Sequence, residues 1–110
     1  MTAVDGLHTA VLSSDGRTIV SVSGEVDVTT VPRLRHALDT ALTRGSRAID
    51  VDFGAVPFCD CSGVNVLLGA WHRARAGGVP LRVTGAEAPV VVRLFQVLGV
   101  ERLLASRPPP

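Results

Sequence analysis

The chain alternates between two kinds of apolar spacing, and this alternation constrains its fold more than any other feature. Segments with alternating or β-branched apolar residues are predicted to be strands: Leu7–Ser13, Thr18–Ser23, Ala48–Phe53 and Leu81–Thr84. Segments with apolar residues three and four apart are predicted to be helices: about 30–44, 62–76 and 88–98. The order ββαβαβα predicts an α/β domain with a single mixed β-sheet of four to five strands and helices packed mainly on one face. The last segment, Val100–Leu104, is either a short strand or a helical turn.

Turn and cap residues set the boundaries of these elements. Ser14-Asp15-Gly16 is typical of a hairpin, because Gly supplies a positive φ. A hydroxyl cap at Thr29-Thr30 and then Pro32 predict a helix start, and Gly45 and Gly77-Gly78 predict helix ends. The residues predicted to face the core are Val20, Val22, Leu34, Leu38, Ala41, Leu42, Ile49, Val51, Phe53, Val64, Leu67, Leu68, Trp71, Val91, Leu94, Phe95 and Leu98. The carboxylates Asp50 and Asp52 fall on the opposite strand face.

Composition narrows the class of protein. A length of 110 residues fits a single domain spanning 1–110, with a core over about 7–104 and a flexible tail at 105–110. The net charge of +1 argues against a nucleic-acid partner, which would favour a basic face. No apolar run approaches the ~20 residues of a membrane span, and no signal-peptide pattern precedes the first strand. We therefore expect a cytoplasmic protein without a membrane partner.

The sequence offers no catalytic or metal-binding pattern. It lacks a Walker-type phosphate loop and a Gly-x-Ser-x-Gly elbow, so an enzyme is not expected. Two thiols, Cys59 and Cys61, cannot complete a four-ligand zinc site. The three histidines, His8, His36 and His72, lie at unrelated spacings. We expect no metal and no cofactor.

Three stretches, in order, resemble the STAS domain of bacterial anti-sigma factor antagonists. These are Gly24-Glu25-Val26-Asp27, the run from Val51-Asp52 to Pro57-Phe58, and Asp60-Cys61-Ser62-Gly63-Val64 followed by Leu67-Leu68. The resemblance extends over about 7–104 and includes Leu98-Gly99-Val100 after the last helix. It implies the STAS fold. It also implies a partner, an anti-sigma factor that is a serine kinase of the histidine-kinase-like ATPase type, from which a sigma factor is released. The partner-binding residues that it implies are Glu25, Asp27, Thr29, Asp60, Cys61, Ser62, Gly63 and Asn65.

The chain departs from the family pattern at one position that bears on regulation. In the family, the kinase phosphorylates the first hydroxyl residue after the Asp, and phosphorylation ends the interaction. Here that position is Cys61, and Ser62 follows. Three hypotheses stay open: binding without phosphorylation control, phosphorylation of Ser62, or redox control through Cys61, whose thiol lies at a helix N-terminus. The structural alternatives are a Ser62 that caps the helix and a Cys61 that is a half-buried filler.

The carboxylates near these stretches also carry two interpretations. Asp27 either contributes to docking or orients its loop and caps the following helix. Asp60 either assists the partner's approach or bonds its own backbone in a turn. A different class of function is a sensory or scaffold STAS module that binds a small ligand or builds a larger assembly. A homodimer through the edge strands of the sheet also stays open.

Overall fold

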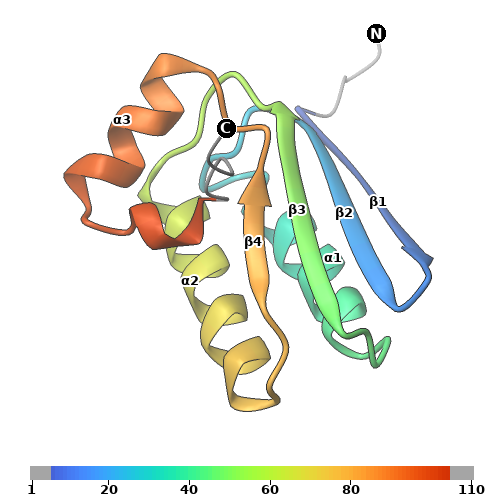
Figure 1. Cartoon of the computed structure of the whole chain (residues 1–110). Coiled ribbons are helices and arrows are strands. Elements are labelled where there is room, and N and C mark those ends of the chain that lie inside the picture. The colour runs from blue at the N-terminus through green and yellow to red at the C-terminus, as the bar shows by residue number, and fades with distance from the viewer. Residues whose placement is uncertain (1–5, 105–110) are drawn as a thin grey trace, which may run out of the picture.

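The computed structural model describes residues 6–104, and its elements follow the order that the sequence predicts (Figure 1). They are β1 (Leu7–Ser14), β2 (Arg17–Gly24), α1 (Val31–Leu42), β3 (Ala48–Ala55), α2 (Cys61–Ala76), β4 (Leu81–Thr84), α3 (Pro89–Val97) and the short 3-10 helix η1 (Glu101–Leu103). The predicted flexible tail at 105–110 lies outside the described residues.

The described residues form a single sheet of four strands in the order β1-β2-β3-β4. β1 and β2 are antiparallel, whereas β2, β3 and β4 run parallel, so the predicted mixed sheet is confirmed. The hairpin between β1 and β2 turns at Asp15 (φ 52°) and Gly16 (φ 80°), the positive-φ pair of a tight two-residue turn. The segment left open after α3 forms η1, and Leu104 then makes one bridge to Val83.

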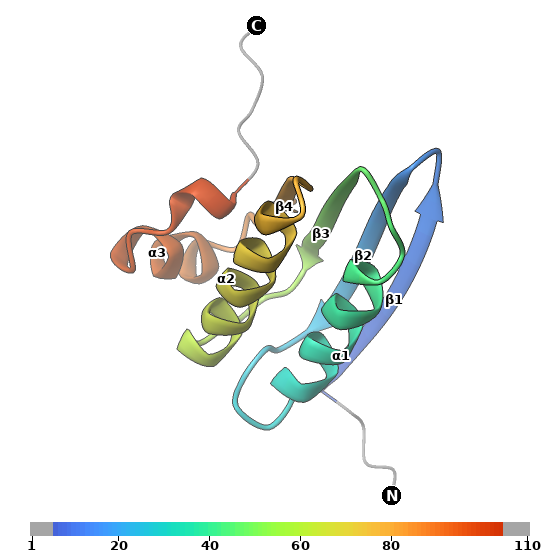
Figure 2. The ribbon, with the colours of Figure 1, turned by 90° about the horizontal axis from the view of Figure 1, so that it is seen from below.

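Helices α1 and α2 cover one face of the sheet (Figure 2). The strand residues predicted to point inward are buried, with Val51 0% and Phe53 1% exposed. They pack in one cluster with Leu34, Leu38 and Leu67 from the two helices. The opposite face is polar, and there Asp50 pairs with Arg17 at 2.7 Å and with Arg82 at 3.5 Å. The alternation along β3 therefore separates core from surface as predicted.

Helix α3 corrects one core prediction. Val91 and Phe95 are fully buried, but Leu98, expected to face inward, is 41% exposed. The helix ends at Val97, and the chain reverses at Gly99 (φ 69°), so Leu98 leaves the inward stripe. Val90 and Val97 of the same helix are also exposed, at 49% and 69%.

Candidate functional site

A single pair of backbone hydrogen bonds holds the two loops that carry the motifs side by side. Val26 N–H donates to Phe58 O at 2.9 Å, and Asp60 N–H donates to Val26 O at 3.0 Å. These bonds form a parallel bridge between Val26 and Cys59, both buried. Because β2 and β3 are parallel, the loops after them leave the same edge of the sheet (Figure 1). Segments about thirty residues apart in sequence, 25–29 and 60–65, are thus joined at that edge.

In the first loop, Asp27 orients its own backbone. Its Oδ1 accepts hydrogen bonds from Thr29 Oγ1 (2.7 Å), Thr29 N–H (2.9 Å) and Thr30 N–H (3.0 Å). The hydrogen bond from the Thr29 side chain, followed by that from the Thr30 backbone, lowers the pKa of Asp27 below its usual value. The carboxylate is therefore ionised and fixed at neutral pH.

The prediction that a threonine hydroxyl caps α1 is wrong. Thr30 occupies the N-cap position, but its backbone is already helical (φ −100°, ψ −17°) and its hydroxyl makes no capping bond. The hydroxyl instead donates to Glu25 O and accepts from Asp27 N–H, each at 2.9 Å. Capping side chains normally extend from a residue in the β region, which explains the difference. The two threonines stabilise the loop and leave α1 to start at Val31 and Pro32.

In the second loop, Asp60 caps α2, so the prediction that Ser62 is the cap is also wrong. Asp60 is extended (φ −105°, ψ −175°), and its Oδ1 accepts from Ser62 N–H at 2.9 Å and from Gly63 N–H at 3.4 Å. The Ser62 hydroxyl donates to the same oxygen at 2.5 Å. A carboxylate gains more than a hydroxyl at this place, because the N-terminus of a helix carries positive potential. As a result α2 begins at Cys61, one residue earlier than expected.

The two cysteines have opposite environments. Cys59 is 2% exposed, and burial, followed by the charge of Asp60, raises its pKa to about 12. Cys61, in contrast, is exposed at the first position of α2, so its expected role as a half-buried filler is wrong. Cys59 forms the bridge with Val26 and is buried in the core, whereas Cys61, at the start of α2, faces outward. Among the two thiols, only Cys61 is open to solvent and to a partner.

Gly63 is required by close packing. A Cβ at this position would lie 2.6 Å from Cys59 Sγ and 2.6 Å from Val26 Cγ1. Both contacts are shorter than real side chains tolerate, so α2 approaches the bridge this closely only with glycine. Gly63 is buried, and the close approach that it allows sets the position of Cys61 and Ser62 at the start of α2.

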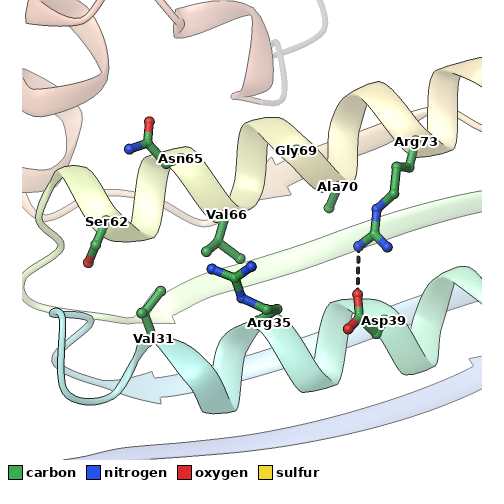
Figure 3. A pocket seen from close by; sticks show the side chains of 9 residues that line it. All are labelled: Val31, Arg35, Asp39, Ser62, Asn65, Val66, Gly69, Ala70 and Arg73. Carbon is green, nitrogen blue, oxygen red and sulfur yellow. Dashed lines mark hydrogen bonds and ion pairs between the residues drawn. The ribbon is translucent and has the colours of Figure 1, made fainter.

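The first of two grooves beside these loops lies between α1 and α2, with a volume of about 570 Å³ (Figure 3). Ser62 and Asn65 lie at one end of it, and Arg73 pairs with Asp39 at 2.6 Å at the other. Arg35 extends from α1 into the space between the helices.

The second groove lies between the start of α2 and α3, with a volume of about 340 Å³. Asp60 and Cys61 line it together with apolar residues that the sequence analysis did not identify as functional: Phe58, Val90 and Val97. Their exposed fractions are 38%, 49% and 69%, unusual for apolar residues of this size. We call this set the α2–α3 groove. A sequence signal existed, since Val90 and Val97 are seven residues apart and lie off the inward stripe of α3.

The predicted partner-binding residues therefore divide between surfaces. Ser62 and Asn65 line the α1–α2 groove, while Asp60 and Cys61 line the α2–α3 groove. The other predicted residues line neither groove: Glu25, Asp27, Thr29 and Gly63. Glu25 and Thr29 are exposed on the adjoining loop, next to Val28, which is 70% exposed.

Two further properties concern residues 6–104 alone. None of their helices combines the length and the apolar character that crossing a membrane would require. Nor do three or more of their His, Cys, Asp and Glu side chains gather where they could hold a metal ion.

Comparison with known proteins identifies the family. The family described as "Mlab, STAS domain" matches residues 9–105. An anti-sigma-B factor antagonist from Staphylococcus aureus is 31% identical over 85 residues, which are 77% of this chain and 78% of that protein. The crystal structure of an anti-sigma factor antagonist from Mycobacterium paratuberculosis superposes with a TM-score of 0.78 at 27% identity, covering 99% of this chain and 92% of that one. The unphosphorylated antagonist SpoIIAA shares the fold, with a TM-score of 0.76 at 21% identity over 92% of this chain and 89% of that one. The chain belongs to the STAS-domain family, and its relatives include anti-sigma factor antagonists.

Proposed function

We propose that this protein is an anti-sigma factor antagonist. Its partner is an anti-sigma factor of the histidine-kinase-like ATPase (serine kinase) type, and binding releases the sigma factor which that partner holds. The names of its relatives support the class of function. We further propose that the protein acts by binding and not by catalysis, and that it does so in the cytoplasm. Both proposals agree with the regulatory role of those relatives.

The α2–α3 groove is the observation that carries this proposal. Phe58, Val90 and Val97 expose apolar surface directly beside Cys61, the position at which the resemblance places the phosphorylated residue. Exposed apolar side chains rimmed by polar groups mark protein interfaces. The acidic loop with Glu25 and Asp27 adjoins this surface through the Val26–Cys59 bridge. A partner that places an apolar contact in the groove and basic residues against the acidic loop would complement both.

Binding is proposed to be independent of phosphorylation. The thiol of Cys61 offers no hydroxyl to a serine kinase. The Ser62 hydroxyl already donates to Asp60 Oδ1 at 2.5 Å, so a phosphate there would lose that bond and place a dianion beside a carboxylate. Both observations favour a docking surface that the kinase cannot switch off.

A second candidate is a sensory or scaffold module that binds a small ligand. The α1–α2 groove favours it, because its volume falls within the range of small-molecule sites and Arg35, Ser62 and Asn65 supply polar groups. A larger assembly would need a further contact. β1 is the edge strand on one side of the sheet, and it could pair with β1 of a second copy. Such a homodimer stays a prediction.

Co-purification tests the leading proposal. The tagged protein is co-expressed with each kinase-like anti-sigma factor of its own genome, and affinity is measured for the pair that co-purifies. Val97→Asp should weaken that affinity at least ~10-fold, since it places a charge in the apolar contact. Leu12→Asp is the matched control, because Leu12 is 63% exposed on β1, away from the groove. Absence of any such pair, or equal affinity in both variants, would contradict the proposal.

A further inference from the structure

A third groove, with one tryptophan and three arginines, lies near the C-terminal end of α2. Its volume is about 410 Å³, and its lining comes from α2, the turn that joins α2 to β4, β4 itself and η1. The charged side chains are Arg75, Arg82 and Arg102, and no acidic residue lines the groove. The chain as a whole has a net charge of only +1, so positive charge is concentrated here. We call it the Trp71 groove, after the aromatic ring that lines it.

Two of these guanidinium groups are held in place by the ring. Arg75 Cζ and Arg102 Cζ each lie 5.1 Å from the centroid of Trp71. A guanidinium over a ring is attracted to the ring by its charge, and its N–H groups that point away from the ring can still donate to a ligand. Within residues 6–104, the Arg75 guanidinium has no hydrogen-bond acceptor, and Arg102 Nη1 makes one long bond of 3.4 Å to Gly99 O. Both side chains are therefore oriented but have most of their donors unused.

The third arginine is only weakly neutralised. Arg82 Nη2 lies 3.5 Å from Asp50 Oδ1, whereas Arg17 Nη1 lies 2.7 Å from the other oxygen of the same carboxylate. One carboxylate thus serves two arginines, and the closer of them is outside the groove. Three cations that line one groove repel each other, and an anionic ligand would relieve that repulsion.

The surrounding backbone decides which kind of anion fits. The N–H groups of Gly77, Gly78 and Val79 donate to α2 carbonyls, at 2.8 to 3.0 Å for their shortest bonds. No backbone donor from this turn is left to surround a phosphate, so a phosphate would depend on the arginine side chains alone. The Trp71 ring, which a nucleobase would need for stacking, already carries two guanidinium groups. Carboxylates spaced along a peptide need one guanidinium fork each, and the groove supplies those forks on separate elements.

We propose that the Trp71 groove binds an acidic segment of a partner polypeptide, with carboxylates bridging to the edges of Arg75 and Arg102. This site is distinct from the α2–α3 groove. Cys61 is the first residue of α2 and Arg75 lies in its last turn, and at 1.5 Å per residue they are roughly 20 Å apart. Figure 1 shows the length of α2 that separates the two ends. The proposal does not depend on the function proposed above, because both sites could be filled at once.

Trp71 provides the readout, since it is the only tryptophan in the chain. The isolated protein is titrated with an end-capped hexaglutamate peptide at low salt, and its tryptophan fluorescence is recorded. We expect a saturable change that weakens as salt is raised, as for contacts between exposed charges. The same titration is run with hexaglutamine, with ATP and with a single-stranded oligonucleotide.

Variants separate a built site from general charge attraction. The double variant Arg75→Gln with Arg102→Gln should weaken hexaglutamate binding at least ~10-fold, as expected when two charge-assisted contacts are lost. Arg75→Lys with Arg102→Lys keeps the charge but loses the forked pair of donors. Its affinity for hexaglutamate should lie between that of the unchanged protein and that of the glutamine double variant. Arg44→Gln with Arg47→Gln, an equal change of charge outside the groove, should bind like the unchanged protein. Circular dichroism checks that each variant is folded.

Three outcomes would overturn the proposal. The first is the absence of a saturable response to hexaglutamate. The second is equal weakening in the Arg75/Arg102 and Arg44/Arg47 glutamine variants, which would indicate general attraction. The third is tighter binding of ATP or of the oligonucleotide at the same residues, which would assign the groove to phosphate ligands.

Discussion

At the scale of single residues, Gly63 tests how closely α2 must approach the bridge between the two loops. Gly63→Ala should lower the free energy of unfolding by about 1–3 kcal/mol, because the new Cβ meets Cys59 Sγ and Val26 Cγ1 at 2.6 Å. Gly69→Ala is the control in the same helix, since a Cβ there has no neighbour within 4 Å. That change should raise stability by about 0.5–1 kcal/mol through helix propensity. Chemical denaturation measures the free energy of unfolding of both variants. An unchanged value for Gly63→Ala would contradict the close packing of Gly63 against Cys59 and Val26.

The cysteines give a second prediction at this scale. At pH 8 iodoacetamide should modify Cys61 in the folded protein and leave Cys59 unmodified, because burial raises the pKa of Cys59 to about 12 and blocks access. Both should react after denaturation, and peptide mass mapping distinguishes them. Equal labelling rates in the folded protein would show that Cys59 is not buried. The redox hypothesis further requires partner binding to fall on mild oxidation of Cys61 and to return with a thiol reductant.

At the scale of elements, the start of α2 depends on Asp60 rather than on Ser62. Asp60→Ala should lower the free energy of unfolding by about 1 kcal/mol, because Ser62 N–H and Gly63 N–H lose their acceptor. Ser62→Ala should lower the free energy of unfolding by less than Asp60→Ala does, since the Ser62 side chain only donates to Asp60. Thermal and urea unfolding of the two variants provide the comparison. A larger loss for Ser62→Ala would restore Ser62 as the cap.

Strands and helices were predictable from sequence because burial follows simple periods. The alternation of Ile49, Val51 and Phe53 with Asp50 and Asp52 placed β3 correctly, and the stripe through Leu34 and Leu38 placed α1. Capping was not predictable in the same way, because Ser62 and Asp60 both suit an N-cap and backbone geometry decides between them. The prediction that Leu98 faces the core was wrong, because the spacing of apolar residues does not show where a short helix ends.

Sites made of distant segments were harder still to predict. The α2–α3 groove combines Phe58 with Val90 and Val97, and the Trp71 groove combines Arg75 with Arg102. No local pattern links such residues, because their contact follows from how α3 and η1 pack. By contrast, the bridge between Val26 and Cys59 joins the motifs that the sequence did identify, since parallel strands end at one edge.

At the scale of the whole molecule, the polar face of the sheet and the helical face have different roles. The helices α1, α2 and α3 frame the α1–α2 and α2–α3 grooves, whereas the open sheet face carries the Arg17–Asp50–Arg82 ion pairs. Exposed pairs of this kind contribute little stability, typically under about 1 kcal/mol each. Partner recognition is therefore expected on the helical face and its adjoining loops.

We propose that this STAS protein binds a kinase-like anti-sigma factor whether or not ATP is present. The most direct measurement adds ATP to the purified complex and follows both complex stability and the intact mass of this chain. We expect the complex to persist and the chain to carry no added phosphoryl group. Cys61→Ser is the matched variant, and it should gain one phosphoryl group and dissociate. If the unchanged chain is phosphorylated and released, and Ser62→Ala abolishes both effects, then Ser62 is a phosphorylation switch and binding is not independent of phosphorylation.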